Sequence, residues 1–186
     1  MNASQRSWME TMNYIASDPG RPAILIVLAQ NNGAPLDEYN LATRAGMFHQ
    51  QLSGQAVETA IMVKHIIDLG NEGFITRAED GYKWEMTPLG ILVSRQWVPG
   101  NIEPETDEPL TTEQIREWRD RIIKMMDYDV GLAEEAGVPK DQWLMTQSQR
   151  LTELVVLNKV LGEQEIPEWL RKMRDEGVIS SDDLSA

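Results

Sequence analysis

The sequence predicts a mainly α protein with a small two-stranded β hairpin, in which a first domain is followed by a helical C-terminal region. Three observations support this fold class. Apolar residues recur at helical spacing along most of the chain. One stretch, 74–86, alternates aromatic and charged residues around an Asp80-Gly81 turn, as a half-buried hairpin does. A segment at 98–110 holds three prolines and four acids, which is typical of a linker.

The N-terminal half is expected to contain four helices. Pro22 suits the first turn of the second helix, where a missing N–H costs nothing. Asp37 can cap the third helix, and Gly46 is expected to end it, with a connection of uncertain shape after it. The expected helices are 4–17, 21–30, 37–46 and 55–69.

The predicted hairpin consists of strands 74–77 and 82–86. Asp80-Gly81 favours the tight turn between them, because glycine adopts positive φ without strain. Thr87 is a good N-cap and Pro88 a good first helical residue, so a helix is expected from there to about Trp97.

The C-terminal half predicts three further helices, at 112–136, 140–162 and from Ile166-Pro167 to about Glu176. The first two of these have more large apolar residues than three helices need to bury among themselves. We therefore expect a homodimer built mainly from the helices at 112–136 and 140–162. The expected division is an N-terminal extension at 1–20, a first domain at 21–97, the linker at 98–110, a helical dimerisation or interaction region at 111–179, and a polar tail at 180–186.

Net charge argues against a large nucleic-acid interface. The chain carries −13, of which residues 21–96 contribute six Lys and Arg against eight Asp and Glu, or −2. Residues 97–186 contribute ten against twenty, or −10. Phosphate contacts supply most DNA affinity and usually leave a basic footprint, and the totals show none. A local basic patch is still compatible with them.

The segment from Asp68 to Arg77 and from Asp80 to Gly90 resembles the winged-helix domains of the MarR, ArsR and PadR groups. The shared pattern is a helix end, a glycine, an apolar strand, a wing, a second strand and Thr-Pro-x-Gly. The resemblance covers roughly 40% of the chain, residues 21–96. It implies that helix 55–69 is a recognition helix that lies in the DNA major groove.

The two faces of this helix follow from the same alignment. Met62, Ile66 and Leu69 fall on the core side. A rotation of about 100° per residue decides which residues lie on the opposite, outer face. Most of the large side chains on this outer face are apolar, whereas base readout needs hydrogen-bonding side chains. A face of this composition is suited to burial against a partner. The outer residues are Val57, Ala60, Ile61, Lys64, Ile67 and Asp68.

Two sets of candidate binding residues follow. Exposed basic and amide side chains can contact phosphates or bases, whereas large apolar and aromatic side chains can anchor a partner protein. The acids Glu79, Asp80 and Glu85 among the basic residues favour ordinary solvated charge there. The DNA-contact candidates are Arg44, Gln50, Gln51, Lys64, Arg77 and Lys83, and the partner-contact candidates are Val57, Ile61, Ile67, Trp118 and Trp143.

No catalytic, cofactor or metal site is expected. The chain has no cysteine, and its two histidines, His49 and His65, lack metal-ligand spacing. No phosphate-binding loop or nucleophile elbow occurs. The longest apolar run, 23–29, is too short to span a bilayer, and no signal peptide is visible. We expect no membrane partner and a cytoplasmic location.

Two functions therefore stay open. The resemblance favours a dimeric DNA-binding transcriptional regulator, which is the leading expectation by a narrow margin. The acidic balance and the apolar outer face favour a protein–protein interaction module, an assembly subunit or inhibitor that does not read DNA. A DNA mimic that presents the acidic C-terminal half is a further form of the second function.

Overall fold

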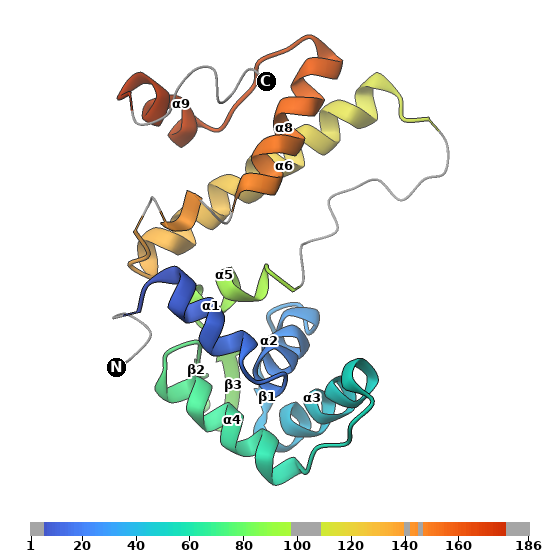
Figure 1. Ribbon diagram of the computed structural model, residues 1–186, viewed down its shortest axis with the longest axis vertical. Coiled ribbons are helices and arrows are strands. Elements are labelled where there is room, and N and C mark those ends of the chain that lie inside the picture. The colour runs from blue at the N-terminus through green and yellow to red at the C-terminus, as the bar shows by residue number, and fades with distance from the viewer. Residues whose placement is uncertain (1–5, 98–108, 140–141, 145–146, 178–186) are drawn as a thin grey trace. The chain divides into compact units, whose positions relative to one another are not determined.

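The computed structural model describes residues 6–97, 109–139, 142–144 and 147–177 (Figure 1). The chain divides into two compact units: an N-terminal unit of residues 1–99 and 132–138, and a C-terminal unit of residues 100–131 and 139–186. The predicted mainly α fold is confirmed. The predicted tail, 180–186, and residues 98–108 of the predicted linker lie outside the described residues.

Among the described residues, five helices form most of the N-terminal unit. Helix α2 is its centre: all six residues from Ala23 to Leu28 are buried, which fits a helix that is apolar on every side. Ser7 and Glu10 form a reciprocal capping box that begins α1, later than the predicted start at residue 4. The helices are α1 (Trp8–Ala16), α2 (Gly20–Gln30), α3 (Glu38–Ser53), α4 (Thr59–Asn71) and α5 (Pro88–Ser94).

Helix α3 corrects the prediction that a helix ends at Gly46. The Asp37 side chain accepts a hydrogen bond from the Asn40 backbone N–H at 2.9 Å and begins the helix as expected. The helix then continues through Gly46 to Ser53, and Gly54, at φ 72°, ends it instead. A Cβ at Gly46 would lie 3.8 Å from the Val57 carbonyl oxygen, an ordinary van der Waals distance, so packing does not require a glycine at this position.

The predicted two-stranded hairpin is part of a three-stranded antiparallel sheet. Strands β2 (Ile75–Arg77) and β3 (Lys83–Met86) pair as predicted, and Gly81 has the expected positive φ. A third strand, β1 (Leu36–Asp37), pairs with the other edge of β3, which places Leu36 opposite Trp84. Sequence pattern missed β1 because two residues are too few to show an alternation.

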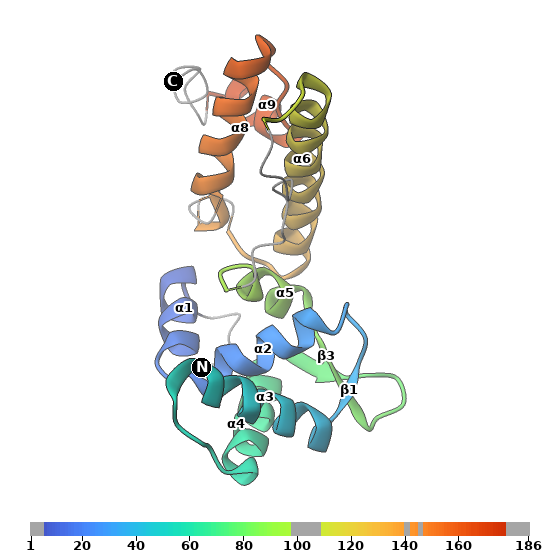
Figure 2. The ribbon, with the colours of Figure 1, turned by 90° about the vertical axis from the view of Figure 1, so that its right-hand side faces the viewer.

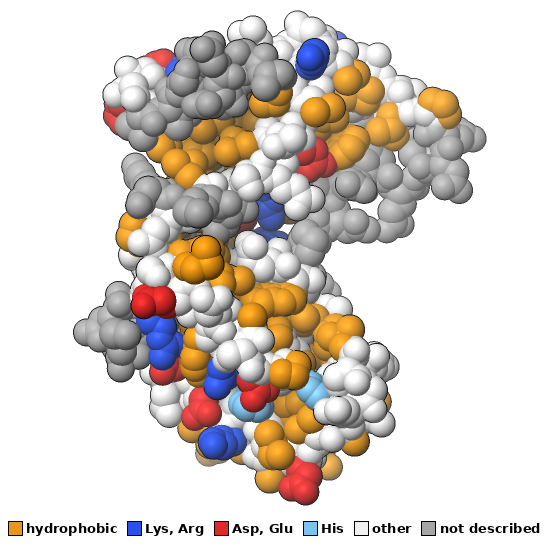
Figure 3. Space-filling view, in the orientation of Figure 1, with side chains coloured by type: hydrophobic (Ala, Val, Ile, Leu, Met, Phe, Trp, Pro, Cys, Tyr) orange, Lys and Arg blue, Asp and Glu red, His pale blue; other side chains and the backbone are white. Residues whose placement is uncertain are grey.

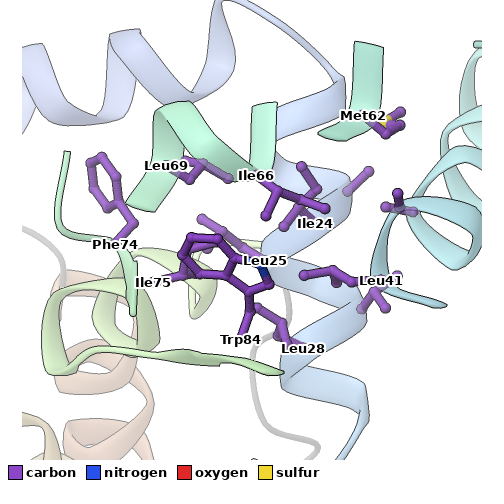
Figure 4. Close-up of a cluster of buried hydrophobic side chains, with 14 of the residues drawn as sticks. Ile24, Leu25, Leu28, Leu41, Met62, Ile66, Leu69, Phe74, Ile75 and Trp84 are labelled. Atoms are coloured by element: carbon purple, nitrogen blue, oxygen red, sulfur yellow. The ribbon is translucent and has the colours of Figure 1, made fainter. Parts of the chain in front are cut away.

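The hydrophobic core of this unit joins α2, α3, α4 and the sheet (Figure 4). The predicted inner face of α4 is confirmed, because Met62, Ile66 and Leu69 are all fully buried. Figure 4 shows Leu69 and Ile66 directed toward the same interior as Ile24 and Trp84. Burial of these side chains fixes which face of α4 points away from the core.

The C-terminal unit is built on residues 112–131 of helix α6 (Thr112–Glu135) and on helices α8 (Ser148–Leu161) and α9 (Glu168–Asp175), seen from a second side in Figure 2. The predicted single helix at 140–162 is interrupted: residues 142–144 are helical, but Gln147 is a turn and a separate helix, α8, begins at Ser148. Helices α6 and α8 share a core that contains Ile122, Met126, Leu154 and Leu157.

Ion pairs join α6 to α8 and to the residue just after it. The Arg150 guanidinium lies 2.5 Å from the fully buried Asp129 carboxylate, which joins the start of α8 to the later part of α6. At the other end, Glu163, just after α8, accepts hydrogen bonds from Arg116 and Arg119 near the start of α6. The two helices therefore run antiparallel.

A candidate partner surface on helix α4 and the wing

The outward face of α4 is the first element of the candidate site. Ile61 and Ile67 are 46% and 45% exposed, and Lys64 between them is also exposed. At about 100° per residue, the two isoleucines project roughly 60° to either side of Lys64. Within the described part of the chain, no carboxylate lies at ion-pair distance from Lys64. This face is therefore a mixed stripe, with one cation between two large apolar side chains.

Val57 does not belong to this exposed stripe. It precedes the first residue of α4, is half-buried and packs against the core of the N-terminal unit. The prediction that Val57 is an outward residue of the helix assumed that the helix starts at residue 55. Because α4 starts at Thr59, helical geometry does not apply to Val57.

At the base of the hairpin formed by β2 and β3 (residues 75–86, called the wing below), Arg77 is held by a cluster that also contains Glu38 and Trp84. One guanidinium nitrogen of Arg77 lies 2.9 Å from a Glu38 carboxylate oxygen, and the guanidinium stacks 3.9 Å from the centre of the Trp84 ring. The Trp84 indole N–H donates to the same Glu38 oxygen at 3.3 Å. The positive charge of Arg77 is therefore matched within the chain, although both side chains are partly exposed and the pair is correspondingly weak.

Lys83, the second cation of the wing, is also matched. Its ammonium lies 3.1 Å from the Asp80 carboxylate. Asp80 in addition accepts hydrogen bonds from the backbone N–H groups of Tyr82 and Lys83, each at 3.0 Å. Together with the Lys83 side chain, these bonds lower the pKa of Asp80, with the Tyr82 N–H the largest cause. Asp80 thus shapes the wing tip and neutralises its lysine.

The three remaining DNA-contact candidates lie on α3. Arg44 is exposed and donates a hydrogen bond to the Asn31 side-chain oxygen at 3.0 Å. Gln50 and Gln51 are exposed near the end of the helix. All six candidates therefore reach solvent, but two of the four cations among them are paired with acids.

The electrostatic character of this region is acidic. Residues 38–86, which include α3, α4 and the wing, carry four Lys and Arg against seven Asp and Glu. In Figure 3, the blue side chains in the part of the view that contains the two histidines are scattered among red ones and do not form a patch. Sequence reasoning counted the acids of the wing but missed Glu38, because its partner Arg77 lies 39 positions away.

The two tryptophan candidates differ in accessibility. Trp143 is buried, and its ring packs edge-on against Trp169 with the ring centres 4.7 Å apart. It therefore stabilises the C-terminal unit and is not a surface anchor, which corrects the prediction. Trp118 is half-buried on α6 and lines a groove between α6 and α8. Apolar character alone could not separate these two positions.

The histidines have structural partners. His49 Nδ1 lies 3.1 Å from the Gln55 carbonyl oxygen, and His65 Nε2 lies 3.4 Å from an Asp18 carboxylate oxygen. Among the described residues, no group of three or more metal-ligating side chains gathers at one place. No helix in the described part of the chain combines the length and apolar character needed to cross a bilayer.

Comparison of the chain with protein-family models, with curated protein sequences and with solved structures gave no significant match.

Proposed function

We propose that this chain is a non-enzymatic protein-interaction module, in which a winged-helix domain uses the outward face of α4 to bind another protein. The observation that carries the proposal is the composition of that face, Ile61 and Ile67 around a single lysine, beside a wing whose two cations are matched by Glu38 and Asp80. The order of three helices, a hairpin and a further helix supports the winged-helix assignment.

The physical argument rests on desolvation and charge. An exposed isoleucine gains free energy when a partner covers it, at about 25 cal/mol per Å² of apolar surface removed from water. DNA offers little apolar surface apart from thymine methyl groups, and it repels a region of net negative charge. A protein surface with an apolar centre and a basic rim complements this region in both respects.

The test identifies the partner by cross-linking from position 61 and then measures its affinity. A photo-crosslinking side chain at position 61 should capture a protein in cells of the source organism, and that protein, once purified, is titrated against the full chain by calorimetry. Ile61→Asp should weaken the complex by roughly 100-fold, because an unpaired carboxylate in an apolar contact costs several kcal/mol. Tyr128→Asp, a change at a similarly exposed position on α6, is the matched control and should leave the affinity unchanged.

A second candidate function, DNA-binding transcription regulation, is favoured by one observation: Lys64, Gln50 and Gln51 are all exposed on the two helices that such a domain uses on DNA. Titration with a library of duplex DNA decides between the two. Under the proposal, Lys64→Ala and Glu38→Gln have no effect on DNA affinity. If this regulator function is correct instead, Lys64→Ala weakens binding, and Glu38→Gln strengthens it by releasing Arg77 to a phosphate.

A further inference from the structure

Helix α8 is apolar on two sides, and the C-terminal unit covers only one of them. Leu154 and Leu157 are buried against α6. On the outer side, Val156 is 53% and Val160 62% exposed. A helix that is apolar all round is usually covered on both sides, so the outer side of α8 has the character of an interface.

A groove lies beside this outer side. It encloses about 650 Å³ between the first turns of α6 and the length of α8. Trp118 forms part of one wall, and its buried indole N–H has no acceptor among the described residues. Val156 and Val160 form part of the other wall, so the exposed valines and the groove make one continuous apolar surface.

The outer side of α8 is complementary to itself in charge. If a two-fold axis passes beside Val156, two copies of α8 run antiparallel, and a residue three positions before Val156 faces one three positions after it. Glu153 then faces Lys159 of the second copy, and the pair occurs twice. Residues four positions away pair Thr152 with Val160, which brings each exposed valine toward the other copy's groove wall.

From this arrangement we propose that the groove and the outer side of α8 form a two-fold symmetric homodimer interface, with α8 of one copy packed antiparallel against α8 of the other. Val156 lies on the axis, Val160 inserts beside the groove, and the two Glu153–Lys159 pairs set the register. A second copy is the occupant that this surface favours. The two-fold axis places the apolar stripe of one copy against the stripe of the other, and it places each Glu153 beside a Lys159 of opposite charge. The inference concerns a different unit from the proposed function and does not depend on it.

Sedimentation of the full chain tests the interface. The wild-type chain is expected to sediment as a dimer at micromolar concentration. Val156→Asp should raise the dimer dissociation constant roughly 100-fold or more, because two carboxylates then meet at the axis without partners. Ile67→Asp is the matched control, a similar change at a similarly exposed position on α4, and it should leave the dimer intact. A wild-type monomer, or a dimer that tolerates Val156→Asp, overturns the proposal.

Charge reversal and cysteine cross-linking test the antiparallel register of the two α8 helices. Neither experiment requires placing an acid at an apolar position, as Val156→Asp does. Glu153→Lys and Lys159→Glu should each weaken the dimer, and the double reversal should restore it. Because the chain has no cysteine, Val156→Cys should give a disulfide-linked dimer on mild oxidation, whereas Tyr128→Cys should not. Failure of the double reversal to restore the dimer, or equal cross-linking at both positions, contradicts the antiparallel register.

Discussion

The Thr87-Pro88-Leu89-Gly90 sequence shows how single residues fix the end of the hairpin. The Thr87 hydroxyl lies 2.7 Å from the Gly73 carbonyl oxygen and also accepts a hydrogen bond from the Gly90 N–H at 3.2 Å. A Cβ at Gly90 would lie 2.0 Å from the Phe74 carbonyl oxygen. The first turn of α5 therefore packs directly on the backbone before β2, and only glycine fits there.

Gly90→Ala should accordingly lower the free energy of unfolding by about 3 kcal/mol, the upper end of overpacking costs, because the clash is with backbone that cannot rotate away. Gly131→Ala is the control: it lies inside α6, no atom of another described segment comes within 4 Å of the added Cβ, and it should stabilise by about 0.5–1 kcal/mol. Urea denaturation monitored by circular dichroism measures both. Equal effects at the two positions would contradict the close packing at Gly90.

Glu163 predicts a pH dependence of the C-terminal unit. Hydrogen bonds from Arg119, and then from Arg116, lower the pKa of its carboxyl below the usual value. A carboxyl whose folded pKa is depressed contributes stability above its unfolded pKa, near 4.3, and the contribution is lost as pH falls through the folded value. Glu163→Gln should therefore lower the melting temperature at pH 7 and have a smaller effect below about pH 4.

Thermal melting of both variants from pH 7 to pH 3 provides the measurement. Glu165→Gln, two positions further along at an exposed site, serves as the control and should leave the curve of melting temperature against pH unchanged. The interpretation fails if Glu163→Gln melts at the wild-type temperature at pH 7.

At the scale of the element, α4 has one buried face and one exposed face, and substitutions on the two faces should have different effects. Ile66 is fully buried and Ile61 is 46% exposed on the same helix. Ile66→Asp should unfold the N-terminal unit, since a carboxylate without a partner in the core costs several kcal/mol. Ile61→Asp should change the free energy of unfolding by less than about 1 kcal/mol, as is usual at the surface.

Chemical denaturation of the two α4 variants distinguishes these effects. A large loss of stability with Ile61→Asp would show that its face is covered within the folded chain, and the proposed partner surface would then have to lie elsewhere.

At the scale of the whole molecule, the net charge of −13 predicts weak association with nucleic acid. Non-specific DNA binding usually has a dissociation constant of about 10⁻⁴ to 10⁻⁶ M at physiological salt, and most of that affinity comes from phosphate contacts. We expect the full chain to bind a random-sequence duplex more weakly than about 10⁻⁴ M. Fluorescence anisotropy at several salt concentrations measures this, and tight binding with a steep salt dependence would favour the regulator function.

Local pattern was sufficient for much of the fold. The spacing of Met62, Ile66 and Leu69 predicted the buried face of α4, because helical period alone decides which side chains share a face. The alternation around Asp80-Gly81 predicted strands β2 and β3 for a similar reason. Proline and threonine likewise placed the start of α5.

Tertiary structure alone decided the rest. Arg77 is neutralised because folding brings Glu38 to it across 39 positions. Trp118 and Trp143 are the same residue type in predicted helices, so the sequence does not distinguish them. In the structure, Trp118 lines a groove, whereas Trp143 is buried against Trp169. Sequence period fixes the direction of a side chain relative to its own element, whereas its charge balance and its exposure depend on which distant segment packs beside it.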